Sequence, residues 1–478
     1  MGITSQFYRP PTAEHIRAVD LTGRRILSEL GIKIVDRSFL DELRQAGAEV
    51  DYNEDRVRFP GDWLDDALKR APRQFVLYSR DGKNDVHLGE GKVHFVNGGR
   101  VFQIVDMVNG GSRRTMLKDV GRTATLVDRM DNIRFYIIAC QAHDIDAENY
   151  HLNDFYQSFN HTTKHVMGGC DHLQGAKQMW KLAAIIAGGE EKFKERPFAS
   201  VITNPISPLT MESATLNILR FCCTHGIPVT CAPAPIAGAT APATLAGTLA
   251  QMHAEALAGA ALTQVFQPGS KVLYGAVPTA MDLRTMSFTM GSVEMALMNA
   301  FAVHLAKLYK LPIYASGGTT EAKRPDIQSG VEKTFSSLLV AMAGGDCIHL
   351  AAGMLDSCNS ISYEQYVIDN EVIGMIHRLL AGIDVNEDTL AFDVISKVGP
   401  GGNYVIEEHT INHMMDEFFY PDLAVRSNFD MWESKGKPGM LTRAHDRVEH
   451  ILADNSDGLL TRPIVAAIKE AFPGLMEG

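Results

Sequence analysis

Eight short apolar segments recur along the chain from residue 93 onward, each bounded by turn-forming residues. They span residues 93–98, 133–139, 164–169, 198–204, 228–233, 271–277, 312–317 and 346–351. Between them lie stretches with apolar residues three and four positions apart, the pattern of amphipathic helices. Because strands that alternate with such helices pair in parallel, the eight units predict an α/β protein with a (β/α)8 TIM barrel over residues 93–360.

The segments on either side of the predicted barrel follow other patterns. Residues 1–92 predict two amphipathic helices, over 13–32 and 37–47, with short strands near 56–60 and 75–81. Residues 361–478 are mostly helical in pattern. Neither segment contains the low-complexity linker of a separable domain. We therefore expect an N-terminal addition and a helical C-terminal addition, both packed on the barrel.

The composition narrows the class of protein. Of the 478 residues, 45% are hydrophobic, and the formal net charge of −12 disfavours a surface for nucleic acid or anionic membranes. Seven scattered cysteines without a Cys-x-x-Cys pair are typical of reduced thiols, and no secretory signal is visible, so we expect a cytoplasmic protein. The most apolar window, 244–266, contains Gln251 and Glu255 and predicts a buried helix.

Polar residues gather where the predicted strands end. Barrel enzymes build their active sites at the carboxyl ends of the strands, where loops present polar groups over an apolar scaffold. Taken singly, each such residue is better explained by hydrogen bonding within a loop, but their convergence predicts a pocket. These residues are Asn97, Arg100, Gln103, Gln141, His143, Asp171, His172, Thr203, Asn204, Thr279, Thr319, Thr320 and His349.

Aromatic residues lie close to the same strand ends. Phe95, Phe102, Tyr274, Tyr363 and Tyr366 can each be an ordinary core residue, but aromatic faces also attract quaternary ammonium ions. The sequence assigns no residue a bond-making step. The substrate-binding residues that it predicts are His349, Asn204, Arg100, Phe102, Gln141, Tyr274, Thr319 and Thr320.

A catalytic metal is disfavoured by the spacing of the histidines. The first predicted strand carries no His-x-His pair, and His161 and His165 straddle the start of another strand. His409 and His413, four residues apart, belong to a helix of the C-terminal addition rather than to the barrel. We therefore expect this chain to bind no metal.

Cofactors that attach to lysine or to glycine-rich turns are disfavoured as well. Lys164 and Lys271 fall at strand beginnings, away from the predicted site, and Lys323 is best explained as a loop salt bridge. The glycine-rich stretches 96–100 and 399–404 lack the spacing and context of a dinucleotide or S-adenosylmethionine site. A pocket without a resident cofactor is the expectation that remains.

Four segments resemble the trimethylamine methyltransferase family of corrinoid-dependent enzymes. They are residues 26–36, 72–99, 200–209 and 314–334, and the likeness keeps their order and extends over nearly the whole chain. The resemblance implies a (β/α)8 barrel that moves a methyl group from an amine to the cobalt of a separate corrinoid protein, which docks over the barrel mouth. It also implies a homo-oligomer and a place in methanogenesis-type one-carbon metabolism.

One position departs from the trimethylamine enzymes within that resemblance. Those enzymes carry pyrrolysine in the segment that corresponds to residues 316–323, and the matching position here is Thr319. The chain is therefore more similar to family members without pyrrolysine, which act on quaternary amines, and among these to the glycine betaine methyltransferases. This similarity implies a betaine as methyl donor.

The sequence also indicates where the cobalt resides. A corrinoid-binding domain of the familiar kind presents Asp-x-His-x-x-Gly, and the nearest stretches here, 346–353 and 170–175, have the wrong spacing. We therefore expect the corrinoid, a cobalamin-type cofactor, on a partner protein. Two alternatives stay open, namely a barrel hydrolase or lyase that acts on a small carboxylate and a quaternary-ammonium binding protein without turnover.

Overall fold

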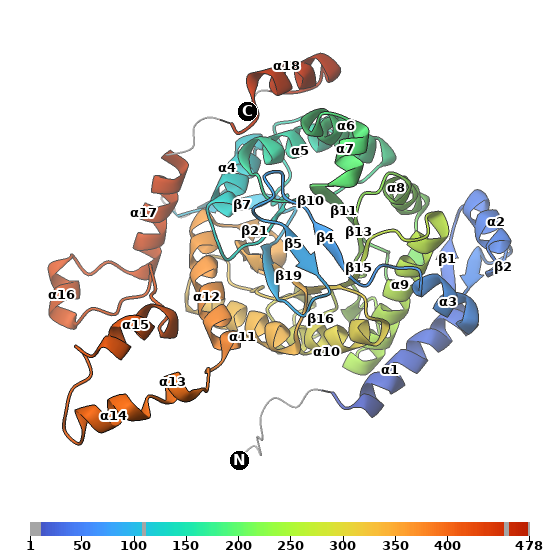
Figure 1. The fold of residues 1–478 in the computed structure, drawn as a ribbon. Helices are drawn as coiled ribbons and strands as arrows, with labels where there is room; N and C mark the ends of the chain where they lie inside the picture. The colour runs from blue at the N-terminus through green and yellow to red at the C-terminus, as the bar shows by residue number, and fades with distance from the viewer. Residues whose placement is uncertain (1–10, 108–110, 454–457, 477–478) are drawn as a thin grey trace.

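Eight parallel strands form a barrel in the computed structural model, which describes residues 11–107, 111–453 and 458–476 (Figure 1). Each strand pairs with the next along the sequence, β19 pairs with β6, and the Phe95–Ile133 bridge joins β6 to the segment before β9. All eight predicted segments overlap an observed strand, which confirms the (β/α)8 barrel. The strands are β6 (His94–Asn97), β9 (Tyr136–Ile137), β10 (Val166–Gly169), β11 (Ala199–Thr203), β13 (Val229–Cys231), β15 (Val272–Ala276), β18 (Ile313–Ser316) and β19 (Cys347–Ala352).

A ring of helices surrounds the strands (Figure 1). The last of them, α12, follows β19 and packs on β19 and on its neighbours α11 and α4, so it closes the ring. The predicted boundary at residue 360 thus falls directly before the eighth barrel helix. The helices are α4 (Leu117–Asp128), α5 (Tyr150–His161), α6 (Leu173–Ala187), α7 (Glu190–Glu195), α8 (Ser213–Thr224), α9 (Leu245–Phe266), α10 (Val293–Tyr309), α11 (Ile327–Ala343) and α12 (Tyr363–Ala381).

The N-terminal addition covers α9, which explains why this helix is apolar on almost every side. Helices α1 (Ala13–Arg25) and α3 (Gly61–Leu68) both pack on it. A small sheet of β1 (Ile32–Ile34), β2 (Glu49–Asp51) and β3 (Arg56–Arg58) accepts β12 (Thr210–Met211), a strand from the loop after β11, and so ties the addition to the barrel. Helix α2 (Arg37–Gln45) and a short π-helix, η1 (Ile26–Leu30), complete it. Among the described residues, no helix has the length and apolar character needed to cross a membrane.

A hairpin fills the amino end of the barrel. Its strands, β4 (Phe75–Leu77) and β5 (Val86–Leu88), alternate buried and less buried residues. The buried side chains Phe75, Leu77, Val86 and Leu88 form one apolar cluster with barrel residues that include Tyr314. The hairpin therefore acts as a floor, which we call the barrel floor.

Two small sheets form the rim at the opposite end. One contains β7 (Gln103–Asp106), β8 (Gly111–Arg114), β20 (Met354–Leu355) and β21 (Ser360–Ile361), with the 3-10 turn η2 (Asp356–Cys358) beside it. The other contains β14 (Ile236–Ala237), β16 (Thr279–Asp282) and β17 (Ser287–Thr289). All of these strands come from loops that follow barrel strands, so the mouth is walled by additional sheet structure.

The C-terminal addition has a packed part and a projecting part. Helix α17 (Met440–Ala453) packs on α12 and α4, and α18 (Arg462–Ala471) packs on α6. Between α12 and α17 lie residues 382–439, which we call the arm, and its helices extend away from the barrel (Figure 1). The arm contains α13 (Glu387–Leu390), α14 (Phe392–Val398), α15 (Glu408–Glu417) and α16 (Phe429–Ser434), none of which has a buried residue. The connection between α15 and α16 returns to the barrel, where Leu423 is buried in the main core and its backbone N–H donates to Glu371 on α12.

Candidate active site

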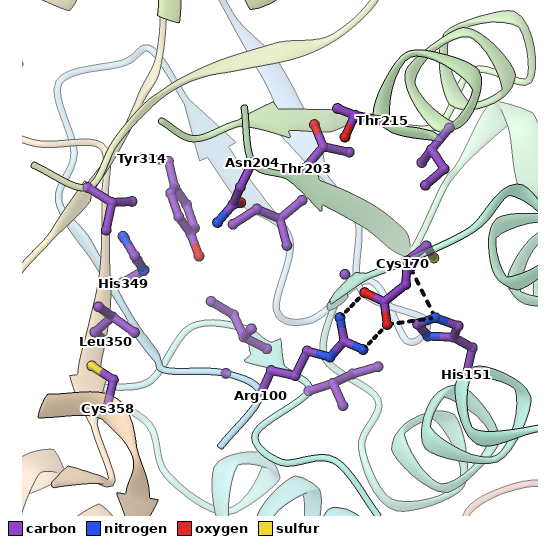
Figure 2. Close-up of a pocket in the computed structure, with 18 of the residues that line it drawn as sticks. Arg100, His151, Cys170, Thr203, Asn204, Thr215, Tyr314, His349, Leu350 and Cys358 are labelled. Carbon is purple, nitrogen blue, oxygen red and sulfur yellow. Dashed lines mark hydrogen bonds and ion pairs between the residues drawn. The ribbon is translucent and has the colours of Figure 1, made fainter. Parts of the chain in front are cut away.

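A cavity of about 650 Å³ lies at the carboxyl ends of the barrel strands. Figure 2 shows its labelled side chains arriving from separate strands and from α5 and α8. Of the eight predicted substrate-binding residues, Arg100, Asn204 and His349 line it, and of the other polar residues at strand ends, Asp171 and Thr203 do. The strand ends thus form a pocket at the predicted place in the fold.

Arg100 is held at one wall of the cavity by an acidic partner. It follows β6 with a φ of 67°, and both of its terminal nitrogens bond the carboxylate of Asp171, which follows β10. The same guanidinium donates to the hydroxyl of Tyr150 at 2.7 Å. The hydrogen bonds from Arg100 hold the pKa of Asp171 well below its usual range. The charge of Arg100 is therefore already neutralised by Asp171.

His349 and Tyr314 form the opposite wall, on β19 and β18. Their rings stack with centroids 3.9 Å apart and planes at 15°, and His349 Nε2 hydrogen bonds with Ser316 Oγ at 2.7 Å. Burial lowers the pKa of His349 to about 3, so its ring is neutral at pH 7. A register shift in β19 lies beside Leu350, whose φ of 67° is that of a bulged residue at a functional edge.

Asp154 is a buried carboxyl group in the same cavity. It lies on α5 and is 5% exposed, and its Oδ1 has no hydrogen-bond partner among the described residues. Burial raises the pKa of this carboxyl group well above the usual range, although the positive charge of Arg100 and the backbone N–H of Ala142 both favour its charged form. His151, one turn earlier, offers no cation because burial lowers its pKa to about 3. This carboxyl oxygen is therefore free to act as the counter-ion of a cationic ligand.

Thr319 and Thr320 lie behind the cavity wall rather than in it. Both are buried, the hydroxyl of Thr319 donates to the carbonyl of Met290, and the hydroxyl of Thr320 donates to Glu332 at 2.6 Å. Met290 in turn lines the cavity. The segment turns at Gly318, whose φ is 75°, and a Cβ atom added there would lie only 2.6 Å from Ala351 Cα, so no side chain fits.

Three other predicted residues also lie outside the cavity lining. Tyr274 points from β15 toward the helices, where its hydroxyl hydrogen bonds with His253 Nδ1 at 2.7 Å, because alternate strand residues face opposite sides. Phe102 is half exposed at the rim, next to His143. Gln141 contributes its backbone to the rim, where its carbonyl oxygen accepts a hydrogen bond from the hydroxyl of Thr115.

A buried ion pair supports the loops behind the cavity. The ammonium group of Lys333 is 3.2 Å from Asp369 Oδ2, and it donates to the carbonyl oxygens of Gly318 and Met354. Burial raises the pKa of Asp369 to about 6, although the neighbouring ammonium favours its charged form. Lys333 therefore joins the loops that follow β18 and β19.

The sequence analysis missed the cavity residues that come from helices and from the rim. These are chiefly His151 and Asp154 on α5, Glu212 and Thr215 at α8, and Phe288 on β17. A signal was present for two of them, since His151, Asn153 and Asp154 place a group of polar residues near the start of α5. Buried polar residues on a barrel helix require a partner, so their presence near a helix start indicates a site.

Comparison with known proteins now assigns the family. The model of the family described as trimethylamine methyltransferase (MTTB) matches residues 3–472. The chain belongs to the trimethylamine methyltransferase family, and it is a methyltransferase. This outcome confirms the resemblance of the four sequence segments.

Individual relatives of known name agree with the family assignment. The chain is 34% identical to trimethylamine methyltransferase MttB of Desulfitobacterium hafniense strain DSM 10664 / DCB-2, over 95% of this chain and 92% of that protein. It is 32% identical to glycine betaine methyltransferase of D. hafniense strain Y51, over 95% of this chain and 94% of that one. Trimethylamine methyltransferase MttB of Methanosarcina barkeri (strain Fusaro / DSM 804) is 32% identical, over 93% and 90%.

The fold is shared with a solved structure of lower sequence identity. The M. barkeri monomethylamine methyltransferase MtmB superposes with a TM-score of 0.55, at 13% identity, over 94% of this chain and 88% of that one. Its hydroxylamine complex gives the same TM-score. These structural similarities support the assignment of a barrel fold to this chain.

Proposed function

We propose that this chain transfers a methyl group from a quaternary amine, glycine betaine or a close analogue, to the cobalt of a separate corrinoid protein. The observation that carries the proposal is the unpaired carboxyl oxygen of Asp154 in the cavity. A quaternary ammonium ion has no N–H group, so it attracts a carboxylate through charge alone and makes no hydrogen bond with it. The family membership supplies the reaction type.

Other residues of the cavity suit the carboxylate of a betaine. Asn204 and Thr215 line the cavity with amide and hydroxyl groups, and Arg100 adds a guanidinium. Tyr314 and Phe288 contribute aromatic faces, which favour methylated ammonium groups. The cavity therefore presents groups for both ends of a zwitterion.

The chemistry needs little from the protein beyond position. The methyl carbon leaves nitrogen for Co(I) of the partner, which acts as a substrate, and the electrons of the broken C–N bond stay on nitrogen. The departing tertiary amine is neutral, so no protonated side chain is required, in agreement with the neutral ring of His349. Holding one methyl group in line with the acceptor is then the main contribution to the rate.

The first test follows methyl-cobalt formation by its absorption spectrum. With Co(I) cobalamin supplied in solution, glycine betaine should give methylated cobalt and an equal amount of dimethylglycine, whereas trimethylamine should react far more slowly. The purified chain should itself be colourless, because the corrinoid is carried by the partner. Comparable rates with the two amines would contradict the proposed donor, and absence of methyl-cobalt would favour a hydrolase, a lyase or a binding protein.

The carrier must reach the cavity and leave again. We place its docking at the barrel mouth, around the two rim sheets, with the modest interface of a transient complex. Because the carrier also serves a second enzyme that removes the methyl group, tight association would slow the cycle. The proposal thus requires fast exchange of the partner.

Self-association is a further part of the proposal. The arm exposes many large apolar side chains, far more than the scattered ones of an ordinary monomer surface. Light scattering on a gel-filtration column should therefore give at least twice the mass of 52.4 kDa, and a chain with Ile406→Asp and Phe392→Asp should be smaller. A wild-type monomer would contradict it. The most exposed arm residues are Ile383, Val385, Leu390, Phe392, Val405, Ile406, Ile411, Met415, Phe418 and Phe429.

A further inference from the structure

We propose that Asp388, His409 and His413 form a binding site for a divalent transition-metal ion such as Zn²⁺, on the arm and away from the cavity. Among the described residues these three form one group whose ligand atoms all lie within 4.8 Å of one another. The site would have a structural role. It goes beyond the proposed methyl transfer and does not depend on it.

The geometry of the three side chains matches a metal site. Four residues apart on α15, the two histidines share one helix face, with ring centroids 4.2 Å apart. His413 Nε2 is 3.1 Å from Asp388 Oδ2, and His409 Nε2 is 3.2 Å from the carbonyl oxygen of Asp388. Zinc bonds of about 2.0–2.1 Å in tetrahedral arrangement separate neighbouring ligand atoms by roughly 3.4 Å. An ion therefore fits between these groups after small side-chain rotations.

The kinds of ligand indicate which ions would bind. Two imidazoles and one carboxylate suit Zn²⁺, Co²⁺ or Ni²⁺, whereas Ca²⁺ and Mg²⁺ prefer oxygen ligands throughout. Asp388 is largely exposed, with 74% of its side chain accessible, so water can complete the coordination. Without an ion, the same groups form an ordinary Asp388–His413 ion pair, which is the alternative that the test must exclude.

The structure of the arm gives an independent reason for a cross-link. None of its four helices has a buried residue, so no apolar core of its own holds α13 and α14 against α15. Apart from the three-residue group, a surface ion pair between Lys397 and Glu407 at 2.6 Å spans the glycine-rich connection of residues 399–402. Exposed ion pairs contribute little, and small units that lack a core are commonly stabilised by metals.

The sequence could not supply this site because the third ligand is distant. The histidine pair alone is a weak pattern, and Asp388 precedes it by more than twenty residues in a different helix. Only the fold of the arm brings α13 beside α15. The expectation that the chain binds no metal considered sites in the barrel and set His409 and His413 aside because they lie outside it.

The test uses the full chain without a polyhistidine tag, stripped with a chelator and then titrated with Zn²⁺ or Co²⁺. One equivalent should bind saturably, and Co²⁺ should show the intense visible bands of low coordination number. Asp388→Asn, His409→Ala and His413→Ala should each weaken binding by at least about tenfold, since even loss of a group that only orients a ligand costs that much. Asp393→Asn, an exposed arm acid outside the group, is the matched control and should bind as wild type.

Limited proteolysis tests the structural role. Zn²⁺ should slow cleavage in residues 399–403 of the wild-type chain and of Asp393→Asn, but not of His413→Ala. The proposal is overturned if no saturable equivalent binds, or if Asp388→Asn and His413→Ala bind Zn²⁺ as tightly as wild type. Binding without protection of the connection would overturn the bracing role. Since neither readout involves methyl transfer, failure here is distinct from failure of the proposed function.

Discussion

Replacement of Asp154 by Asn should weaken glycine betaine binding by about 100-fold, measured by calorimetry on the chain without corrinoid partner. Arg100 is already paired with Asp171, and the rings of His151 and His349 are neutral. Of the two remaining acidic residues of the cavity, Glu212 is exposed and Asp154 is buried, so Asp154 is the carboxyl group placed to balance a bound cation. Loss of one partner from a buried charge pair costs about 2–5 kcal/mol, and each 1.4 kcal/mol is tenfold in affinity.

A ligand that lacks only the positive charge isolates the electrostatic part of this effect. In 3,3-dimethylbutanoate a carbon atom replaces the ammonium nitrogen of glycine betaine, and the shape is nearly unchanged. The wild type should prefer glycine betaine strongly, whereas the Asp154→Asn variant should bind the two ligands about equally. Equal loss of both ligands would mean that Asp154 supports the cavity shape and not the cation.

The pH dependence follows from the direction of the pKa shift. Burial raises the pKa of Asp154, so the free protein holds this group protonated at pH values where an exposed carboxyl is charged. A bound cation favours the carboxylate, and binding then releases a proton. Affinity should therefore rise by up to about tenfold per pH unit until the raised pKa is passed, and then level off. In Asp154→Asn the profile should be flat.

The same shift predicts the effect of this substitution on stability. A carboxyl group whose pKa is raised on folding binds more protons in the folded state, so it costs stability as the pH rises from its unfolded pKa to its folded pKa. Asn removes that cost. The thermal midpoint of Asp154→Asn at pH 7 should accordingly be no lower than that of wild type, which separates weak binding from misfolding.

Replacement of Lys333 by Met should lower the free energy of unfolding by about 3–5 kcal/mol, the usual cost of breaking a buried ion pair by removing one partner. The substitution leaves Asp369 buried without its cation and removes donors from the carbonyls of Gly318 and Met354. Urea denaturation followed by circular dichroism measures the change.

Lys323 provides the matched control for this experiment. It is also paired with an aspartate, Asp356, but 71% of its side chain is exposed, so Lys323→Met should cost less than about 1 kcal/mol. Adding Asp369→Leu to Lys333→Met should recover part of the loss, because the uncompensated carboxylate is then gone. A Lys333→Met variant as stable as Lys323→Met would refute the argument.

How far the sequence predicts this protein depends on the kind of contact. The barrel is predictable because the spacing of apolar residues in strands and helices is a local property of the sequence. Arg100, Asn204 and His349 could be placed at the cavity because they lie at or near the carboxyl ends of predicted strands. Whether Tyr274 points inward depends on the pleat of β15, and the role of Thr319 depends on Met290 across a loop. Asp154 reaches the cavity only because α5 starts at the mouth. Such placements require the tertiary structure.

The barrel floor has a consequence for the order of events in a catalytic cycle. The hairpin that carries Phe75, Leu77, Val86 and Leu88 fills the amino end of the barrel. Ligands therefore enter and leave the cavity through the mouth. In the complex that we propose, the carrier docks over this same opening. An amine must then enter before the carrier arrives, and the demethylated product waits until the carrier departs. Because the amino end is closed, the proposed cycle is ordered: the amine binds first, the carrier then binds and leaves, and the demethylated product is released last.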